Sequence, residues 1–129
     1  MEKRVINPWQ WQNERHYAQG IEVKHVESTL YCAGQAAVHA DGTSSSADMH
    51  TQLLIAISNL EKVISEAGYE TRNIVRLNVY TTNHEEFFKS FDTFGEWIAK
   101  NEIQQAATFF EVKSLFETLS VELEATVVR

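Results

Sequence analysis

The sequence predicts an α+β domain, in which a single mixed β-sheet carries two helices on one face. Two segments have apolar residues at helical spacing along one side only, so each needs a sheet to cover. The segments around them are rich in β-branched and aromatic residues and alternate in polarity, as strands do. In chain order, these segments predict the arrangement βββαβαββ.

Three short antiparallel strands are expected first. They cover Tyr17–Val23, Glu27–Cys32 and Gln35–His39. Residues 24–26 join the first two, and Asp41-Gly42 ends the third, because Asp-Gly pairs favour tight turns. The expected sheet therefore begins on the amino-terminal side of both helices.

The first helix is expected from Asp48 to Ala67, after a loop and helix cap in the Thr43-Ser44-Ser45-Ser46 segment. Gly68 follows as the residue that can adopt the left-handed conformation at a helix end. Apolar residues at steps of three and four define its buried face: Leu53, Ile57, Leu60, Ile64 and Ala67.

The second helix is expected from His84 to Lys100, with Asn83 as its N-cap. Its apolar face consists of Phe87, Phe91, Phe94 and Ile98. This helix packs beside the first one on the sheet.

The remaining strands are expected at Ile74–Thr81, Ala107–Val112 and Leu119–Val128. Along the first of them, alternation points Val75, Leu77 and Val79 toward the helices. The other face of such a sheet would be left half apolar and uncovered, which is typical of an interface between subunits.

Composition limits the classes of protein that fit the sequence. A chain of 129 residues with 43% hydrophobic residues suits one domain, expected over 17–129 after an amino-terminal arm over 1–16. We expect the two tryptophans of the arm, Trp9 and Trp11, to pack on a neighbouring subunit; the alternative is that they wall the cleft with aromatic surface. The net charge of −7 and the scattered basic residues argue against nucleic acid as a partner.

The amino-acid composition and motifs also predict a cytoplasmic protein without a metal or cofactor. The single cysteine, Cys32, cannot form an internal disulfide, and no Cys/His spacing matches a zinc site. No phosphate-binding or dinucleotide-binding glycine pattern is present. No apolar run approaches the roughly 20 residues that span a bilayer, so no membrane association is expected.

Several segments together carry a resemblance to a known family. They are Gln105–Val112 running into Leu119–Val127, Gly34-Gln35, Glu66-Ala67-Gly68 and Asn73–Arg76. From about Tyr17 to Val128, the chain resembles the YjgF/Rid family of reactive-intermediate (imine) deaminases, also described as endoribonuclease L-PSP-like. The resemblance implies a chorismate-mutase-like fold and a homotrimer around a central barrel-like arrangement. It also implies small-molecule clefts between the subunits.

The resemblance makes Glu122 the catalytic candidate, because it falls on the family position whose carboxylate positions the attacking water. Burial in a cleft would raise the pKa of this carboxyl toward neutrality, which suits a general base. The alternative is that Glu122 and Glu124 are solvated residues on a strand face, since alternation alone predicts polar residues there.

The resemblance also indicates substrate-binding positions. Tyr17 matches a tyrosine near the cleft mouth, although a packing tyrosine at the start of a strand explains it equally well. Gly34-Gln35 matches a Gly-Gln pair at which glycine permits close approach of the backbone to a ligand. A tight connection between strands would use the same two residues.

The chain departs from the family pattern at the substrate-binding strand. Ala107 occupies the position of the arginine that holds the substrate carboxylate, and no other side chain reproduces a guanidinium fork. Ala33 and Phe91 replace polar family residues. Thr108 can still donate one hydrogen bond, whereas Phe109 makes the expected cleft narrower and more apolar. A cleft shared by subunits leaves room for a compensating arginine, for which the candidates are Arg15, Arg72 and Arg76.

Three functional hypotheses follow, and the sequence leaves open whether the chain is an enzyme. The first is hydrolysis of a neutral or non-carboxylate imine, enamine or related compound with Glu122 as the base. The second is a trimer that binds a small apolar metabolite without turnover. The third is ribonuclease activity, which the acidic charge disfavours.

Overall fold

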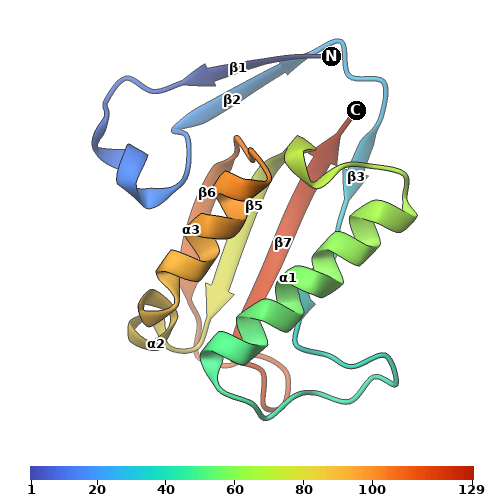
Figure 1. Cartoon of the computed structure of the whole chain (residues 1–129), viewed down its shortest axis with the longest axis vertical. Coiled ribbons are helices and arrows are strands. Elements are labelled where there is room, and N and C mark those ends of the chain that lie inside the picture. Colours follow the sequence, from blue (N-terminus) through green and yellow to red (C-terminus); the bar gives the residue numbers. More distant parts are fainter.

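The computed structural model describes all 129 residues and is built around a five-stranded mixed sheet (Figure 1). Its hydrogen-bonded order is β3 (Thr29–Tyr31), β7 (Val121–Val128), β5 (Ile74–Thr81) and β6 (Ala106–Glu111), and β4 (Gln35–Ala36) also pairs with β7. β5 and β6 are parallel, whereas β7 runs antiparallel to β3, β4 and β5. The predicted α+β class with a mixed sheet is therefore confirmed.

The long helix α1 (Met49–Glu66) has the predicted extent, but its cap is Asp48 and not a residue of the Thr43–Ser46 segment in which the cap was expected. The Asp48 side chain caps it by accepting a hydrogen bond from the Thr51 amide at 2.9 Å. Ala67 closes the helix, and Gly68 follows with a φ of +79°, the left-handed conformation that glycine adopts without strain.

The expected second helix is broken into α2 (His84–Lys89) and α3 (Phe91–Lys100). Asn83 caps α2 as predicted, accepting from the Glu86 amide at 3.2 Å. The break lies at Ser90, whose amide donates to the Phe87 carbonyl three residues back. This tightened turn redirects the chain, and it keeps α1 and α3 on the same face of the sheet (Figure 1).

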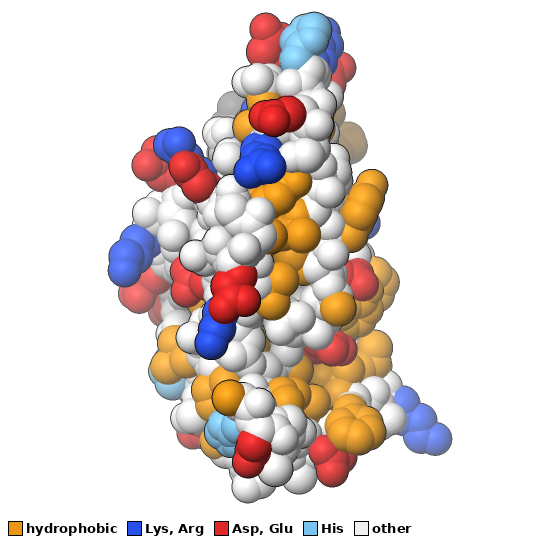
Figure 2. All heavy atoms as spheres, turned by 90° about the vertical axis from the view of Figure 1, so that its right-hand side faces the viewer, with side chains coloured by type: hydrophobic (Ala, Val, Ile, Leu, Met, Phe, Trp, Pro, Cys, Tyr) orange, Lys and Arg blue, Asp and Glu red, His pale blue; other side chains and the backbone are white.

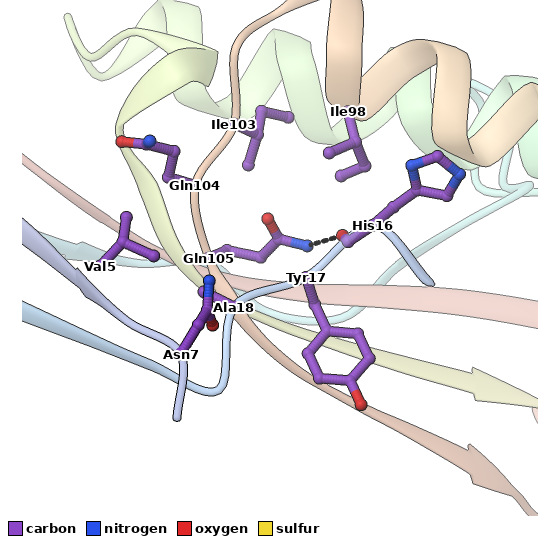
Figure 3. A pocket seen from close by; sticks show the side chains of 9 residues that line it. All are labelled: Val5, Asn7, His16, Tyr17, Ala18, Ile98, Ile103, Gln104 and Gln105. Carbon is purple, nitrogen blue, oxygen red and sulfur yellow. Dashed lines mark hydrogen bonds between the residues drawn. The ribbon is translucent and has the colours of Figure 1, made fainter. Parts of the chain in front are cut away.

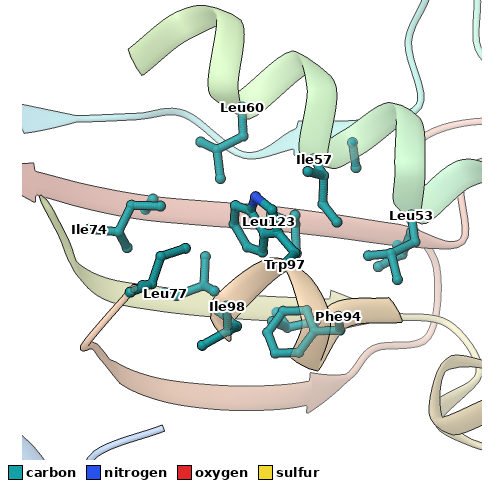
Figure 4. Packing of buried hydrophobic residues seen from close by; sticks show 14 of the residues in the cluster. Leu53, Ile57, Leu60, Ile74, Leu77, Phe94, Trp97, Ile98 and Leu123 are labelled. Atoms are coloured by element: carbon teal, nitrogen blue, oxygen red, sulfur yellow. The ribbon is translucent and has the colours of Figure 1, made fainter. Parts of the chain in front are cut away.

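The core lies between these helices and the sheet (Figure 4). The predicted α1 residues Leu53, Ile57, Leu60 and Ile64 are buried there, but Ala67, at the end of the helix, is exposed. On β5, Leu77 and Val79 face the helices as expected, but Ile74 takes the place predicted for Val75. A register irregularity between Ile74 and Arg76 explains the difference, because a bulge shifts the alternation by one residue.

The amino-terminal arm contains a strand that the sequence did not indicate. β1 (Glu2–Ile6) pairs antiparallel with β2 (Gly20–Lys24) in a separate two-stranded sheet, and a 3₁₀ turn (Trp11–Arg15) lies between them. The strand expected at Tyr17–Val23 therefore begins later and lies outside the main sheet. The arm joins that sheet at β6, where the Ala18 amide donates to the Gln105 carbonyl at 2.8 Å.

The surface shows little charge segregation on the side drawn in Figure 2, where Lys and Arg side chains are scattered among acidic ones. Both β3 and β4 are shorter than predicted, although the Cys32 amide just after β3 still donates to the Ala125 carbonyl of β7 at 2.9 Å. None of the helices is both long enough and apolar enough to cross a membrane.

Candidate functional site

The candidate site lies on the sheet face that the helices leave uncovered. Alternation along β7 points four apolar side chains into the core, Val121, Leu123, Ala125 and Val127. Glu122 and Glu124 project from the opposite face and are half-buried. Period-two alternation thus places two carboxylates side by side on an open sheet.

Glu122 lies directly over Gly34. A Cβ atom added to Gly34 would be 2.6 Å from Glu122 Oε1 and 2.7 Å from its Cδ, closer than real Cβ contacts come. β4 pairs Gln35 with Leu123 and Ala36 with Glu122, which holds the two segments together. The structure therefore brings together two predicted residues, Gly34 and Glu122, whereas the Gln35 side chain, paired with the core residue Leu123, lies on the side of α1.

The Glu122 carboxyl has no hydrogen-bonded side-chain partner and no ion pair in the chain. Burial raises the pKa of this carboxyl, and the nearby charge of Glu124 raises it further. Both effects disfavour the ionised form of Glu122. It is an acid poised closer to neutrality than an exposed glutamate.

Glu124, in contrast, is hydrogen-bonded and has a lowered pKa. Its Oε1 accepts from Asn78 Nδ2 and from the Tyr80 hydroxyl, both at 2.9 Å. These hydrogen bonds lower the pKa of Glu124, with a smaller contribution from the charge of Arg76. Two neighbouring carboxyl groups with pKa values shifted apart are typical of acid–base sites.

The polar residues of β5 complete this face of the sheet. Tyr80 stacks on Phe110 with ring centroids 5.0 Å apart and planes inclined by 11°. The Asn78 Oδ1 atom is buried without a hydrogen-bond partner. Arg76 lies one row further along the face, with a nitrogen 3.4 Å from the Thr108 hydroxyl. A free acceptor, Asn78 Oδ1, and a cation, Arg76, thus lie on the same face of the sheet as Glu122 and Glu124.

Arg76 is the one of the three candidate arginines that shares this face. The Arg15 guanidinium lies 4.9 Å from the Trp11 ring, and Arg72 is bound to Glu70. Arg76 is exposed and contacts the site through Thr108, so it remains free to reorient.

Two of the expected substrate-binding residues face the other way. Ala107 and Phe109 pair with Leu77 and Val79, whose side chains point into the core. The Phe109 ring packs among three helix residues, Phe87, Phe91 and Phe94, at centroid distances of 6.1, 6.1 and 5.7 Å. Within one chain, therefore, position 107 does not reach the face that carries Glu122.

Tyr17 is also remote from Glu122 within one chain. It lines a hollow of about 210 Å³ between the arm and the carboxyl end of α3 (Figure 3). Gln105 lies at the centre of that view and donates to the His16 carbonyl at 2.8 Å, while its own Oε1 is unpartnered. The Tyr17 ring points away from Ile103 and Gln104.

No group of three or more His, Cys, Asp or Glu side chains is placed to hold a metal ion. Cys32 is buried, and burial raises the pKa of its thiol, so it is a poor nucleophile.

Sequence reasoning missed the network formed by Asn78, Tyr80 and Glu124. The signal was present, because polar residues at every second position of β5 predict one polar face. It also missed the pairing of His84 with Glu111, which are far apart in sequence.

Comparisons with known proteins agree on one family. The sequence profile described as Endoribonuclease L-PSP matches residues 10–129. A RutC family protein of Aquifex aeolicus is 23% identical over 113 residues, which cover 88% of each chain.

Two solved structures extend the comparison. A protein of unknown function from Yersinia pestis, YyfB of the conserved Rid protein family, is 28% identical and covers both chains fully, with a TM-score of 0.87. Escherichia coli TdcF, solved with bound serine, is 22% identical over 88% of this chain and 87% of that one, with a TM-score of 0.72. The second likeness shows the fold alone.

Proposed function

The chain belongs to the endoribonuclease L-PSP family, that is, the YjgF/Rid family of small-molecule proteins, and on this basis we propose that it hydrolyses a small imine or enamine without a carboxylate. The observation that carries the proposal is the state of Glu122. Its carboxyl group is unpartnered, has a raised pKa and lies against the backbone of Gly34. A raised pKa suits a general base that works near neutral pH, and an unpartnered carboxyl is free to accept a proton from water.

The reaction follows from this geometry. Glu122 takes a proton from a water molecule as the water oxygen attacks the imine carbon, and returns that proton to the nitrogen to give a tetrahedral carbinolamine. Glu122 then moves the hydroxyl proton of the carbinolamine to the amino nitrogen as the C–N bond breaks, and a carbonyl compound and ammonia leave. The Gly34 amide, which makes no backbone hydrogen bond in the chain, is the donor for the substrate's polar atom.

Glu124 acts in this proposal as the fixed neighbour of the base. Asn78 and Tyr80 hold it ionised, so its negative charge keeps the pKa of Glu122 raised. The arrangement separates the roles of the two acids: Glu122 exchanges protons, and Glu124 keeps its charge.

The charge of the site selects the substrate. A substrate carboxylate would meet Glu122 and Glu124, and Ala107 supplies no guanidinium to hold it. Arg76 is exposed and two residues along β5 from Asn78, so it contributes only a screened attraction. A neutral or cationic imine suits these residues better than an imino acid.

The proposal includes a homotrimer in which the uncovered sheet face is shared between subunits. Tyr31 supports it, because its side chain lies on that face and is 79% exposed. In such an assembly, Tyr17 and Ala107 of one subunit can approach Glu122 of another. Light scattering after size-exclusion chromatography measures the mass of the assembly in solution. The mass of a single chain would contradict the proposed trimer.

A non-catalytic binding protein is the second candidate. It is favoured by Phe109, which is packed among aromatic residues at a strand where the family pattern has substrate contacts. It predicts that a ligand raises the melting temperature without being consumed. Ribonuclease activity is not proposed, because acidic residues outnumber basic ones by 18 to 11 and the site itself carries two acids.

The test compares two imines generated in place. An amine oxidase acting on butylamine supplies a neutral imine, and a dehydratase acting on threonine supplies 2-iminobutanoate. We expect the protein to accelerate ammonia release from the neutral imine above the spontaneous rate and to leave 2-iminobutanoate unchanged. Acceleration of 2-iminobutanoate alone would contradict the proposed substrate class, and acceleration of neither would favour the binding protein.

A further inference from the structure

A second hollow lies at the edge of the sheet between α2 and β6, and it shares no residue with Gly34, Glu122 and their hydrogen-bonded neighbours. Its volume is about 230 Å³. Val79, Thr81 and Phe87 form a buried floor, while Phe88 and Phe110 are exposed at the rim. Phe109, one of the residues expected in the substrate cleft, also lines this hollow. This volume is below that of pockets for drug-sized ligands, roughly 300–1,000 Å³, so it suits one ring with a short chain.

A hydrogen-bonded pair, His84 and Glu111, lines the same hollow. Glu111 Oε1 accepts from the His84 amide at 3.0 Å and lies 2.7 Å from His84 Nδ1. These two hydrogen bonds lower the pKa of Glu111, so the carboxylate is ionised at neutral pH.

The ionised carboxylate determines which ring nitrogen of His84 carries the hydrogen. Because a carboxylate only accepts, Nδ1 must be the donor of the 2.7 Å contact. In the neutral imidazole, Nε2 is then left as an acceptor. The hollow therefore offers a nitrogen lone pair to a ligand that can donate a hydrogen.

Glu111 is the only acidic residue that lines the hollow, and no Lys or Arg lines it. The Lys89 ammonium group, which is close in sequence, is bound to Glu86 at 2.7 Å. The faces of aromatic rings attract cations as well. The hydrogen-bond acceptor, the Glu111 carboxylate and the phenylalanine walls all favour an organic cation over an anion.

We propose that the hollow between α2 and β6 binds a small arylalkylammonium ion, a class of ligand independent of the hydrolysis proposed at Glu122. The ring lies between Phe88 and Phe110 over the Phe87 floor. The ammonium group donates a hydrogen bond to His84 Nε2 and lies in the field of Glu111.

The first test is a titration of the full-length protein with three probes of similar shape, followed through backbone amide NMR signals. The probes are 2-phenylethylammonium, the neutral 2-phenylethanol and the anionic 3-phenylpropionate. We expect saturable shifts in residues 79–88 and 109–111 with the ammonium, about tenfold weaker binding of the alcohol and none of the carboxylate. Equal binding of all three, or shifts that map elsewhere, would overturn the proposal.

The second test uses variants that keep the shape of the hollow. Glu111→Gln removes the charge and His84→Phe removes the acceptor, and each should weaken binding of 2-phenylethylammonium about tenfold. Both side chains are about half exposed, so thermal unfolding should remain close to that of the wild type. Glu96→Gln and His50→Phe, at exposed helix positions, are the matched controls and should bind as the wild type does. Wild-type affinity in Glu111→Gln would refute the assignment.

Discussion

The Glu122 carboxyl group occupies the space that a side chain at Gly34 would need, since a Cβ there would lie 2.6 Å from Glu122 Oε1. The acid is thereby seated against the backbone, where burial raises its pKa. Two residues along the strand, Glu124 is bound by Asn78 and Tyr80, and its pKa is lowered. This contrast between neighbouring acids underlies the predictions that follow.

Glutamine substitutions at the two acids should change stability in opposite directions at pH 7. The raised pKa of Glu122 means that folding favours its protonated form, and this stabilisation is lost as pH rises through the folded pKa. Glu122→Gln should therefore raise the melting temperature.

The effect of Glu124 on stability has the opposite sign. Its pKa is lower in the folded state, so its ionised form stabilises the fold at pH values above its unfolded-state pKa. This contribution is lost as the pH falls through its folded-state pKa. Glu124→Gln should lower stability at pH 7 by about 1 kcal/mol or less, given solvent screening at a half-buried site. Denaturation curves at pH 7 and in strong acid measure both effects. Shifts of the same sign for both variants at pH 7 would contradict the assigned pKa directions.

Gly34→Ala should impair the proposed reaction more than it impairs folding. The added methyl group collides with the end of the Glu122 side chain, which can swing away at a cost of about 1 kcal/mol. We expect ammonia release to fall at least about tenfold, because a base displaced by an ångström loses its alignment. In Gly20→Ala the nearest atom, Ile6 Cβ, is 3.7 Å away, so this control should keep full activity. A fully active Gly34→Ala protein would show that the seating of Glu122 is irrelevant.

Asn59 connects α1 to the segment beneath the site. Its Nδ2 donates to the carbonyls of Ala36 and Val38, both at 2.9 Å. Asn59→Ala leaves two carbonyls without this donor, which should cost about 1–3 kcal/mol in urea denaturation. Ser58→Ala, at an exposed neighbouring position on the same helix, should be neutral. Unchanged stability of Asn59→Ala would mean that water replaces the amide fully.

The parts of the fold that were predicted from the sequence have strong local periodicity. α1 carries its apolar residues at helical spacing between an Asp48 cap and Gly68, and β7 alternates along its whole length. β1 has no such signal, because its place depends on pairing with a strand about 20 residues away. The break at Ser90 and the shift at Ile74 depend on single hydrogen bonds and on register, which periodicity does not specify.

The candidate site was predicted only in part for a related reason. The resemblance placed Glu122, Gly34 and Gln35 together, and the structure has Gly34 against Glu122 but turns the Gln35 side chain toward α1. Ala107 and Phe109 were grouped with them, yet alternation along β6 turns both toward the helices, and Thr108 faces the site instead. The expected cleft lies between subunits, so the placement of Ala107 and Phe109 beside Glu122 stays a prediction that a single chain does not test.

The most direct test of the central claim is the rate of ammonia release from the neutral imine generated from butylamine, measured for Glu122→Gln beside Glu96→Gln. Both variants remove one carboxylate, but Glu96 is exposed on α3, on the opposite side of the sheet. We predict that Glu96→Gln keeps the wild-type rate and that Glu122→Gln loses about 10²–10⁴-fold, the usual contribution of a general base. Equal rates in the two variants would contradict the assignment of Glu122 as the base.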